Sequence, residues 1–162
     1  MRAATPSRLR VFTVLFLAAV GGFASPAARS AIASCTVNAS GVVFGTYTPL
    51  QAGALASNGT VSIACTGVSG RNTITIDLSP GASGNYLTRT LVAGTFTLNY
   101  DLYVDAAYTQ VWGNGTGGSA EGTARIRRRT PNVTLTVYGA IAARQDPAPG
   151  SYTDNITVSV NY

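Results

Sequence analysis

The residues of this chain that come closest to acid–base chemistry are six carboxylates, because the sequence contains neither histidine nor lysine. They are Asp77, Asp101, Asp105, Glu121, Asp146 and Asp154. Catalytic triads, histidine-ligated metal sites and lysine Schiff bases are thereby excluded. A carboxylate pair is the machinery of a glycosidase, but Asp101 and Asp105 flank a strand end, where turn and surface roles are the ordinary explanation. We therefore predict a protein that is not an enzyme and holds no cofactor or metal.

The first 33 residues have the pattern of a cleaved secretory signal. Arg2, Arg8 and Arg10 precede the apolar run VFTVLFLAAVGGFA, and Ala31-Ile32-Ala33 provides a small-x-small cleavage site. The run is shorter than the roughly 20 residues that span a bilayer. We predict a signal at residues 1–33 and one exported domain at residues 34–162. We expect this domain to pass through the periplasm and then to reside at the cell surface or to be secreted.

Removal of the signal changes the charge of the chain. Four of the 11 arginines lie within residues 1–33, so seven remain against six acids and the mature net charge is about +1. A nucleic-acid-binding domain usually carries a strong basic excess, so we predict no nucleic-acid partner. One basic segment remains, RIRRR, with Arg125, Arg127, Arg128 and Arg129. It is either a solvated loop or strand edge, or a contact for an anionic surface polysaccharide or a partner chain.

Two cysteines, Cys35 and Cys65, are present and no thiol is left over. In an exported chain such a pair indicates a disulfide, and there is no CxxC motif to suggest a metal or redox site. We expect the bond to connect the first strand to the next.

From Ser34 onward, short alternating segments are separated by clusters of Gly, Asn, Ser or Pro, which is the pattern of strands and turns. Strands are predicted at 34–39, 42–47, 60–65, 72–78, 95–104, 109–113, 132–139 and toward the chain end, with a polar loop around Asn58-Gly59. No stretch carries a sustained helical period, so helices should not exceed a turn or two. Seven or eight strands at this spacing predict an all-β, immunoglobulin-like sandwich, with a closed barrel as the alternative.

The last of these strands raises a question of pairing. Ile156, Val158, Val160 and Tyr162 alternate with polar residues, as in a half-buried strand. A hydrophobic strand pairs on both sides or leaves an adhesive edge. We expect another protein molecule to lie alongside it.

Several segments resemble the spore coat protein U domain family, which includes the pilin subunits of archaic chaperone-usher pili. They are CTVNASGVVFGTYTP (35–49), VSIAC (61–65), LTRT (87–90), LNYDLYVDAAYTQVWGNG (98–115) and VYGAIAARQDPAPGSYTDNITVSVNY (137–162). The resemblance covers nearly all of the mature chain in the family's order. Its most specific parts are the Cys-to-FGxY opening, the LxYxLYxDA…WGxG block and the YGxI…GxYxDxxxVxVxY ending.

The resemblance implies an incomplete sandwich that lacks its last strand and is completed by donor-strand complementation. A periplasmic chaperone lends the strand, and an extension of another pilus subunit replaces it after passage to an outer-membrane usher. On this sequence the acceptor edge would include Ile156, Val158, Val160 and Tyr162.

The segment before Cys35 departs from the pilin pattern. Cleavage after Ala33 leaves only Ser34, and an earlier cleavage leaves PAARSAIAS, with small residues where a donor strand has large ones. This favours a subunit that only accepts a strand, or a coat protein that completes its own sheet. The alternative function is a self-complete secreted coat or carbohydrate-binding module, with Trp112, Tyr108 and RIRRR contacting glycans; the core is the ordinary place for Trp112.

Overall fold

The structure, a computed structural model, describes residue 32 and residues 34–162. The predicted signal thus lies outside the described residues apart from Ile32, which packs against the core. The strands are β1 Ser34–Ser40, β2 Leu55–Thr66, β3 Arg71–Leu78, β4 Arg89–Ala93, β5 Phe96–Tyr103, β6 Gly122–Arg127, β7 Asn132–Ile141 and β8 Val158–Asn161. A single 3₁₀ turn, η1 Gly81–Ser83, is the helical element of the described residues, as the sequence predicts.

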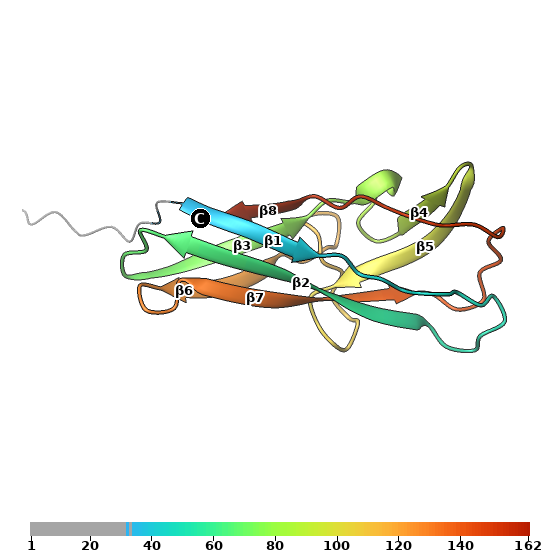
Figure 1. The fold of residues 1–162 in the computed structure, drawn as a ribbon, viewed down its shortest axis with the longest axis horizontal. Coiled ribbons are helices and arrows are strands. Elements are labelled where there is room, and N and C mark those ends of the chain that lie inside the picture. The colour runs from blue at the N-terminus through green and yellow to red at the C-terminus, as the bar shows by residue number, and fades with distance from the viewer. Residues whose placement is uncertain (1–31, 33) are drawn as a thin grey trace, which may run out of the picture.

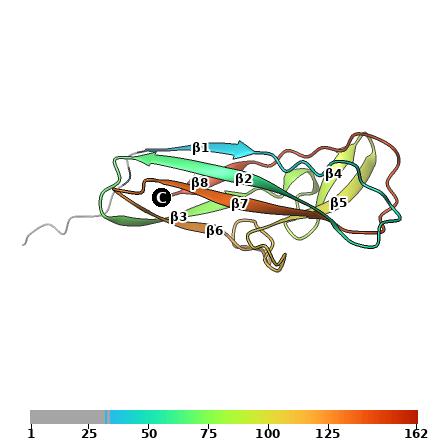
Figure 2. The same cartoon turned by 60° about the horizontal axis from the view of Figure 1, so that its bottom comes forward.

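The strands form two antiparallel sheets packed face to face (Figures 1 and 2). The larger sheet has the order β1-β2-β7-β5-β4 and the smaller sheet the order β6-β3-β8. Two separate sheets of this kind make an immunoglobulin-like sandwich, so the predicted fold class is confirmed and the closed barrel was the wrong alternative. β1 and β8 lie at the same long side of the sandwich and contact each other.

The core follows from the period-2 alternation of the strands. On β3, the side chains of Ile74, Ile76 and Leu78 are buried while Thr73 and Thr75 face outward. On β6, Ile126 is buried between two outward arginines. Each sheet therefore presents one apolar face to the other.

Trp112 is the largest buried side chain and lies between the sheets with 1% of its surface exposed. Its indole Nε1 donates a 2.7 Å hydrogen bond to the Ile76 carbonyl, which satisfies the one polar group of the ring. Its ring edge fills the space beside Gly122, where a side chain would collide with it. Trp112 is therefore a core residue, and its predicted surface contact with a glycan is wrong.

Arg89, at the start of β4, is also fully buried. Its guanidinium donates to the carbonyls of Ser79, Tyr86 and Trp112 and packs over the Tyr86 ring. Burial lowers the pKa of Arg89, although the main-chain oxygens satisfy its donors. The side chain thereby connects β4 to the loops that carry η1 and Trp112.

The disulfide joins neighbouring strands in register. Cys35 on β1 lies opposite Cys65 on β2, with their Cα atoms 4.0 Å apart and their sulfurs bonded. The predicted bond is confirmed.

Two predicted boundaries differ from the structure. Residues 42–47 alternate like a strand but form no ladder: the pairing with β2 ends at Ser40, and Val42 and Phe44 then pack on the inner face of the large sheet against Gly139. Asn58-Gly59 forms no loop and continues β2, where both residues pair with β7. The ladder overrides the turn preference of Asn-Gly, and the missing side chain of Gly59 admits the Ser40 carbonyl, 2.7 Å from where a Cβ would stand.

The sequence pattern did not predict β4 and β6, and it predicted too long a strand at residues 109–113. Alternation in β4 is hidden by the buried Arg89, and in β6 by the small inward residues Gly122 and Ala124. The predicted strand at 109–113 is reduced to isolated bridges at Val111 and Trp112.

Candidate functional site

A groove of about 940 Å³ opens at the end of the molecule that the small sheet leaves uncovered. Its walls are two segments without regular strand structure, residues 41–47 and residues 147–156. Its floor is the inner face of the large sheet, formed by Val61, Val137, Ile141, Leu98, Leu102 and Leu91. The lining is mainly apolar, so the groove suits a hydrophobic occupant.

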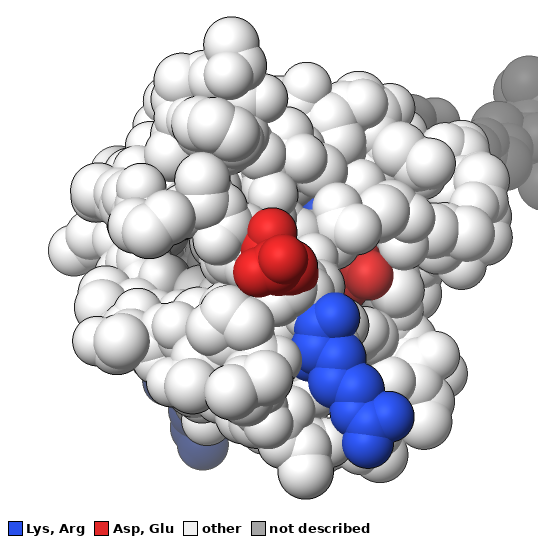
Figure 3. All heavy atoms as spheres, turned by 90° about the vertical axis from the view of Figure 1, so that its right-hand side faces the viewer, with Lys and Arg blue, Asp and Glu red and all other residues white. Residues whose placement is uncertain are grey.

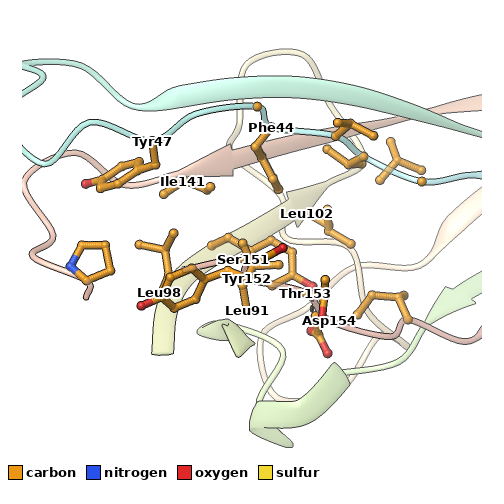
Figure 4. A pocket seen from close by; sticks show the side chains of 18 of the residues that line it. Phe44, Tyr47, Leu91, Leu98, Leu102, Ile141, Ser151, Tyr152, Thr153 and Asp154 are labelled. Atoms are coloured by element: carbon orange, nitrogen blue, oxygen red, sulfur yellow. Dashed lines mark hydrogen bonds between the residues drawn. The ribbon is translucent and has the colours of Figure 1, made fainter. Parts of the chain in front are cut away.

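Residues 41–47 form the first wall. Figure 4 shows Phe44 and Tyr47 on one side of the groove and Leu91, Leu98 and Tyr152 on the other. Val42 and Phe44 fill the space above Gly139, where a Cβ would lie 2.7 and 2.8 Å from their side-chain atoms. The Tyr47 hydroxyl donates to the Ala142 carbonyl (2.9 Å) and accepts from the Gln145 amide (2.8 Å). The wall is therefore held by side chains rather than by strand pairing.

The second wall changes sheets along its length. Val92 of β4 and Thr153 exchange two main-chain hydrogen bonds, of 2.8 and 3.1 Å, so this part belongs to the large sheet. Four residues later, the Ser79 amide donates to the Thr157 carbonyl (2.9 Å) and β8 begins to pair with β3 of the small sheet. The wall therefore bridges the open end of the sandwich.

Asp154 holds this crossing in place. Its carboxylate accepts hydrogen bonds from the Tyr100 hydroxyl (2.7 Å) and from the amides of Ala82 and Asn155 (2.9 and 2.8 Å). A side chain at Gly81 would collide with the same carboxylate. Burial and the hydrogen bond to Asp154 raise the pKa of Tyr100. The phenol therefore stays neutral and remains a donor.

The four predicted acceptor residues lie along one side of this C-terminal segment. Ile156 and Val158 line the groove, while Val160 packs against the core beyond it. Tyr162 is 59% exposed. Within residues 34–162, β8 pairs with β3 on one side and with no strand on the other.

The main-chain groups of β8 alternate in direction. Thr157 directs both its N–H and its carbonyl toward Ser79. Because alternate residues of a strand direct their main-chain groups to the same side, the N–H and carbonyl groups of Ser159 and Asn161 also face β3. Ile156, Val158 and Val160 therefore direct their N–H and carbonyl groups to the opposite side. This free edge, residues 156–160, runs beside the groove.

Sequence reasoning missed most of the groove. Phe44, Tyr47, Leu91, Leu98 and Tyr152 were not predicted as site residues, because their shared surface depends on non-local pairing. The signal available in the sequence was the FGxY and GxYxD motifs, which supply Phe44, Tyr47, Tyr152 and Asp154.

The predicted arginine contact lies elsewhere, at the opposite end of the molecule. Arg125 and Arg127 point outward from β6, and Arg128 and Arg129 are exposed in the turn to β7. Tyr108, 37% exposed, packs edge-on against Tyr103 and Tyr138 on another face. The structure therefore does not bring Trp112, Tyr108 and the arginines together into one glycan site.

Four of the six carboxylates, those of Asp77, Asp101, Asp105 and Asp154, accept hydrogen bonds within the fold. Asp105 accepts hydrogen bonds from Gln110 and Thr109 in its own turn, and these bonds lower its pKa. Burial raises the pKa of Asp101. Among the described residues no three His, Cys, Asp or Glu side chains gather as a metal site would require. Nor does this part of the chain contain a helix with the length and hydropathy to cross a membrane.

The fold and the groove define an immunoglobulin-like sandwich with one uncovered end. A model of the Spore Coat Protein U domain matches residues 23–159, and the chain belongs to this family. No curated protein matches the sequence.

The solved structures that are similar in fold include one from an archaic chaperone-usher pilus. It is the crystal structure of the CsuC–CsuE chaperone–tip adhesion subunit pre-assembly complex, from the archaic chaperone-usher Csu pili of Acinetobacter baumannii. The matched chain is 24% identical with a TM-score of 0.53, and the match covers 80% of this chain and 39% of that chain. At this identity the likeness shows the fold.

Proposed function

We propose that this chain is an exported, non-enzymatic subunit of a surface fibre of the chaperone-usher type, and that its groove accepts a strand from another protein chain. A periplasmic chaperone supplies the strand first and another pilus subunit supplies it later, after passage to an outer-membrane usher. Membership of the spore coat protein U family and the fold shared with a chain of the Csu complex support this class of function.

The observation that carries the proposal is the free edge of residues 156–160 beside an apolar groove. A strand laid along this edge would pair with the main-chain groups of Ile156, Val158 and Val160, and its alternate side chains would enter the groove. Main-chain pairing supplies register and the pockets supply specificity in this mode of recognition. The walls at 41–47 and 147–156 are not paired with each other, so a strand can lie between them.

The energy of such an insertion is comparable with the stability of the whole domain. Burial of four or five large apolar side chains contributes about 6–15 kcal/mol, at about 1.5–3 kcal/mol each. A domain of this size is stable by about 5–15 kcal/mol. The uncomplemented chain is therefore marginally stable and prone to edge pairing.

The test is to purify the mature chain alone and with a synthetic peptide of alternating large apolar residues. We expect the isolated chain to be oligomeric or to melt without cooperativity, and the peptide to produce a monomer with a sharp, higher melting transition. Size-exclusion chromatography with light scattering and circular dichroism measure the two effects.

A peptide of the same composition with the alternation scrambled is the matched control, because it has the same hydrophobicity without the pattern that fits the groove. A monomeric isolated chain with a cooperative melt that neither peptide changes would contradict the proposal and favour a self-complete coat protein.

A further inference from the structure

We propose that five arginines at the end of the sandwich opposite the groove form a binding site for a linear anionic polysaccharide. This arginine cluster comprises Arg71, Arg125, Arg127, Arg128 and Arg129. Arg71 is the member that the sequence did not associate with the others, because 54 positions separate it from Arg125 along the chain.

The sheet register brings the cluster together. Arg71 of β3 lies directly opposite Arg127 of β6, and Arg125 faces Thr73 two positions along the same pair of strands. All three side chains point outward, because they occupy exposed positions on strands whose alternate residues, Ile74 and Ile126, are buried. Side chains directly opposite on one face lie about 5 Å apart at Cβ. Arg128 and Arg129 extend this row into the β6–β7 turn.

No carboxylate neutralises the cluster within the described chain. None of the five arginines makes a salt bridge or a side-chain hydrogen bond to a described residue. The other two arginines of residues 34–162 stand against six acidic residues, so the remainder of the domain carries a formal charge of about −4. The positive charge of the mature chain is therefore concentrated at one end.

The pairing of two of these arginines costs the fold stability. Like charges directly opposite each other on a sheet face are destabilising, and Arg71 opposite Arg127 is such a pair. A purely structural surface would favour Thr or opposite charges at these positions. A polyanionic ligand would relieve this repulsion.

The surroundings of the cluster favour a polysaccharide over a membrane. The outward neighbours on the two strands are Thr73, Thr75 and Thr123, whose hydroxyls suit sugar hydroxyls. A membrane-binding surface would add aromatic or aliphatic anchors, and none of these outward neighbours is apolar. Guanidinium groups bind carboxylate, sulfate and phosphate esters in a bidentate manner. The predicted export of the chain brings it to the polyanions of the cell surface and matrix.

The cluster and the groove lie at opposite ends of the molecule. Figure 1 shows the β6–β7 and β2–β3 turns at one end and the segments that wall the groove toward the other. Figure 3 views that other end, where a few acidic and basic side chains lie among mostly uncharged ones. A polysaccharide bound at the cluster therefore leaves the groove accessible to a strand.

The test is binding of the secreted chain, with its fold verified by circular dichroism, to heparin and to polygalacturonate, with neutral dextran as the comparison. We expect saturable binding to the two polyanions that weakens with salt, because exposed charges are screened. The variant Arg125→Gln/Arg127→Gln/Arg128→Gln should lose at least about tenfold in affinity, equivalent to about 1.4 kcal/mol.

A matched pair separates the cluster from net charge. Arg127→Gln and Arg144→Gln remove one positive charge each from exposed positions, but only the first should weaken binding. Arg71→Thr should weaken binding and raise the melting temperature, an outcome that a structural role for the arginine does not predict. Equal binding by both members of the pair, no binding to either polyanion, or binding to anionic vesicles alone would overturn the proposal.

Discussion

At the scale of single residues, the hydrogen bond between Tyr100 and Asp154 controls the crossing of the C-terminal segment between sheets. Tyr100 is 5% exposed, and its phenol donates to the carboxylate that also accepts two amides. We predict that Tyr100→Phe lowers the free energy of unfolding by about 2 kcal/mol, the usual contribution of a hydrogen bond to a charged group. Chemical denaturation of the chain with a donor peptide bound measures the change, and Tyr162→Phe at an exposed position is the control.

The same residue predicts a dependence on alkaline pH. Burial, with the bond to Asp154, raises the pKa of Tyr100 above its unfolded value of about 10. A raised pKa contributes stability that is fully present below about pH 10 and is lost as the pH rises above it. With a donor peptide bound, the wild-type melting temperature should therefore fall above about pH 10 more steeply than that of Tyr100→Phe. Parallel curves for the two proteins would contradict this assignment.

At the scale of elements, β8 has one edge that is paired with β3 and one edge that is free within residues 34–162. The amide of Val158 faces away from β3, whereas that of Ser159 faces β3. Proline is tolerated in an edge strand where its missing N–H faces outward. We predict that Val158→Pro leaves the fold largely intact but weakens the binding of a donor peptide by about tenfold or more, since it removes a hydrogen bond along the free edge.

Ser159→Pro is the control for that substitution, because it interrupts the β3–β8 ladder and should reduce the strand content of the chain before any peptide is added. Peptide titration by calorimetry and circular dichroism of both variants measure these effects. Unchanged peptide affinity in Val158→Pro would place the donor elsewhere.

At the scale of the whole molecule, the disulfide acts on the unfolded chain. It closes a loop with a sequence separation of 30 residues and joins two strands that are already in register. We predict that Cys35→Ala/Cys65→Ala lowers the free energy of unfolding by about 3–4 kcal/mol in the chain-entropy model. Urea denaturation of the chain with a donor peptide bound measures this free energy. Reductant should produce a similar loss in the wild type and none in the double variant; a wild type that is indifferent to reductant would contradict the prediction.

The amino-acid sequence by itself determined the class of fold and the faces of several strands. The alternation of Ile74, Ile76 and Leu78 is a local consequence of burial on one side of a sheet, so it can be read without knowing the partners. The disulfide followed from the presence of two cysteines in an exported chain. The same two-residue alternation predicted which side chains of the C-terminal strand face inward, namely those of Ile156, Val158 and Val160.

Only the tertiary structure decided which alternating segments pair and which residues share a surface. Residues 42–47 have the pattern of a strand, yet they pack across the inner face of the large sheet and form a wall of the groove. The missing side chains of Gly59 on β2 and Gly139 on β7 leave the space that this packing needs. Arg71 joined the other arginines through the register of β3 and β6. Periodicity records whether a side chain is buried, whereas pairing and register depend on neighbours distant in the chain, and both the groove and the arginine cluster are products of that pairing.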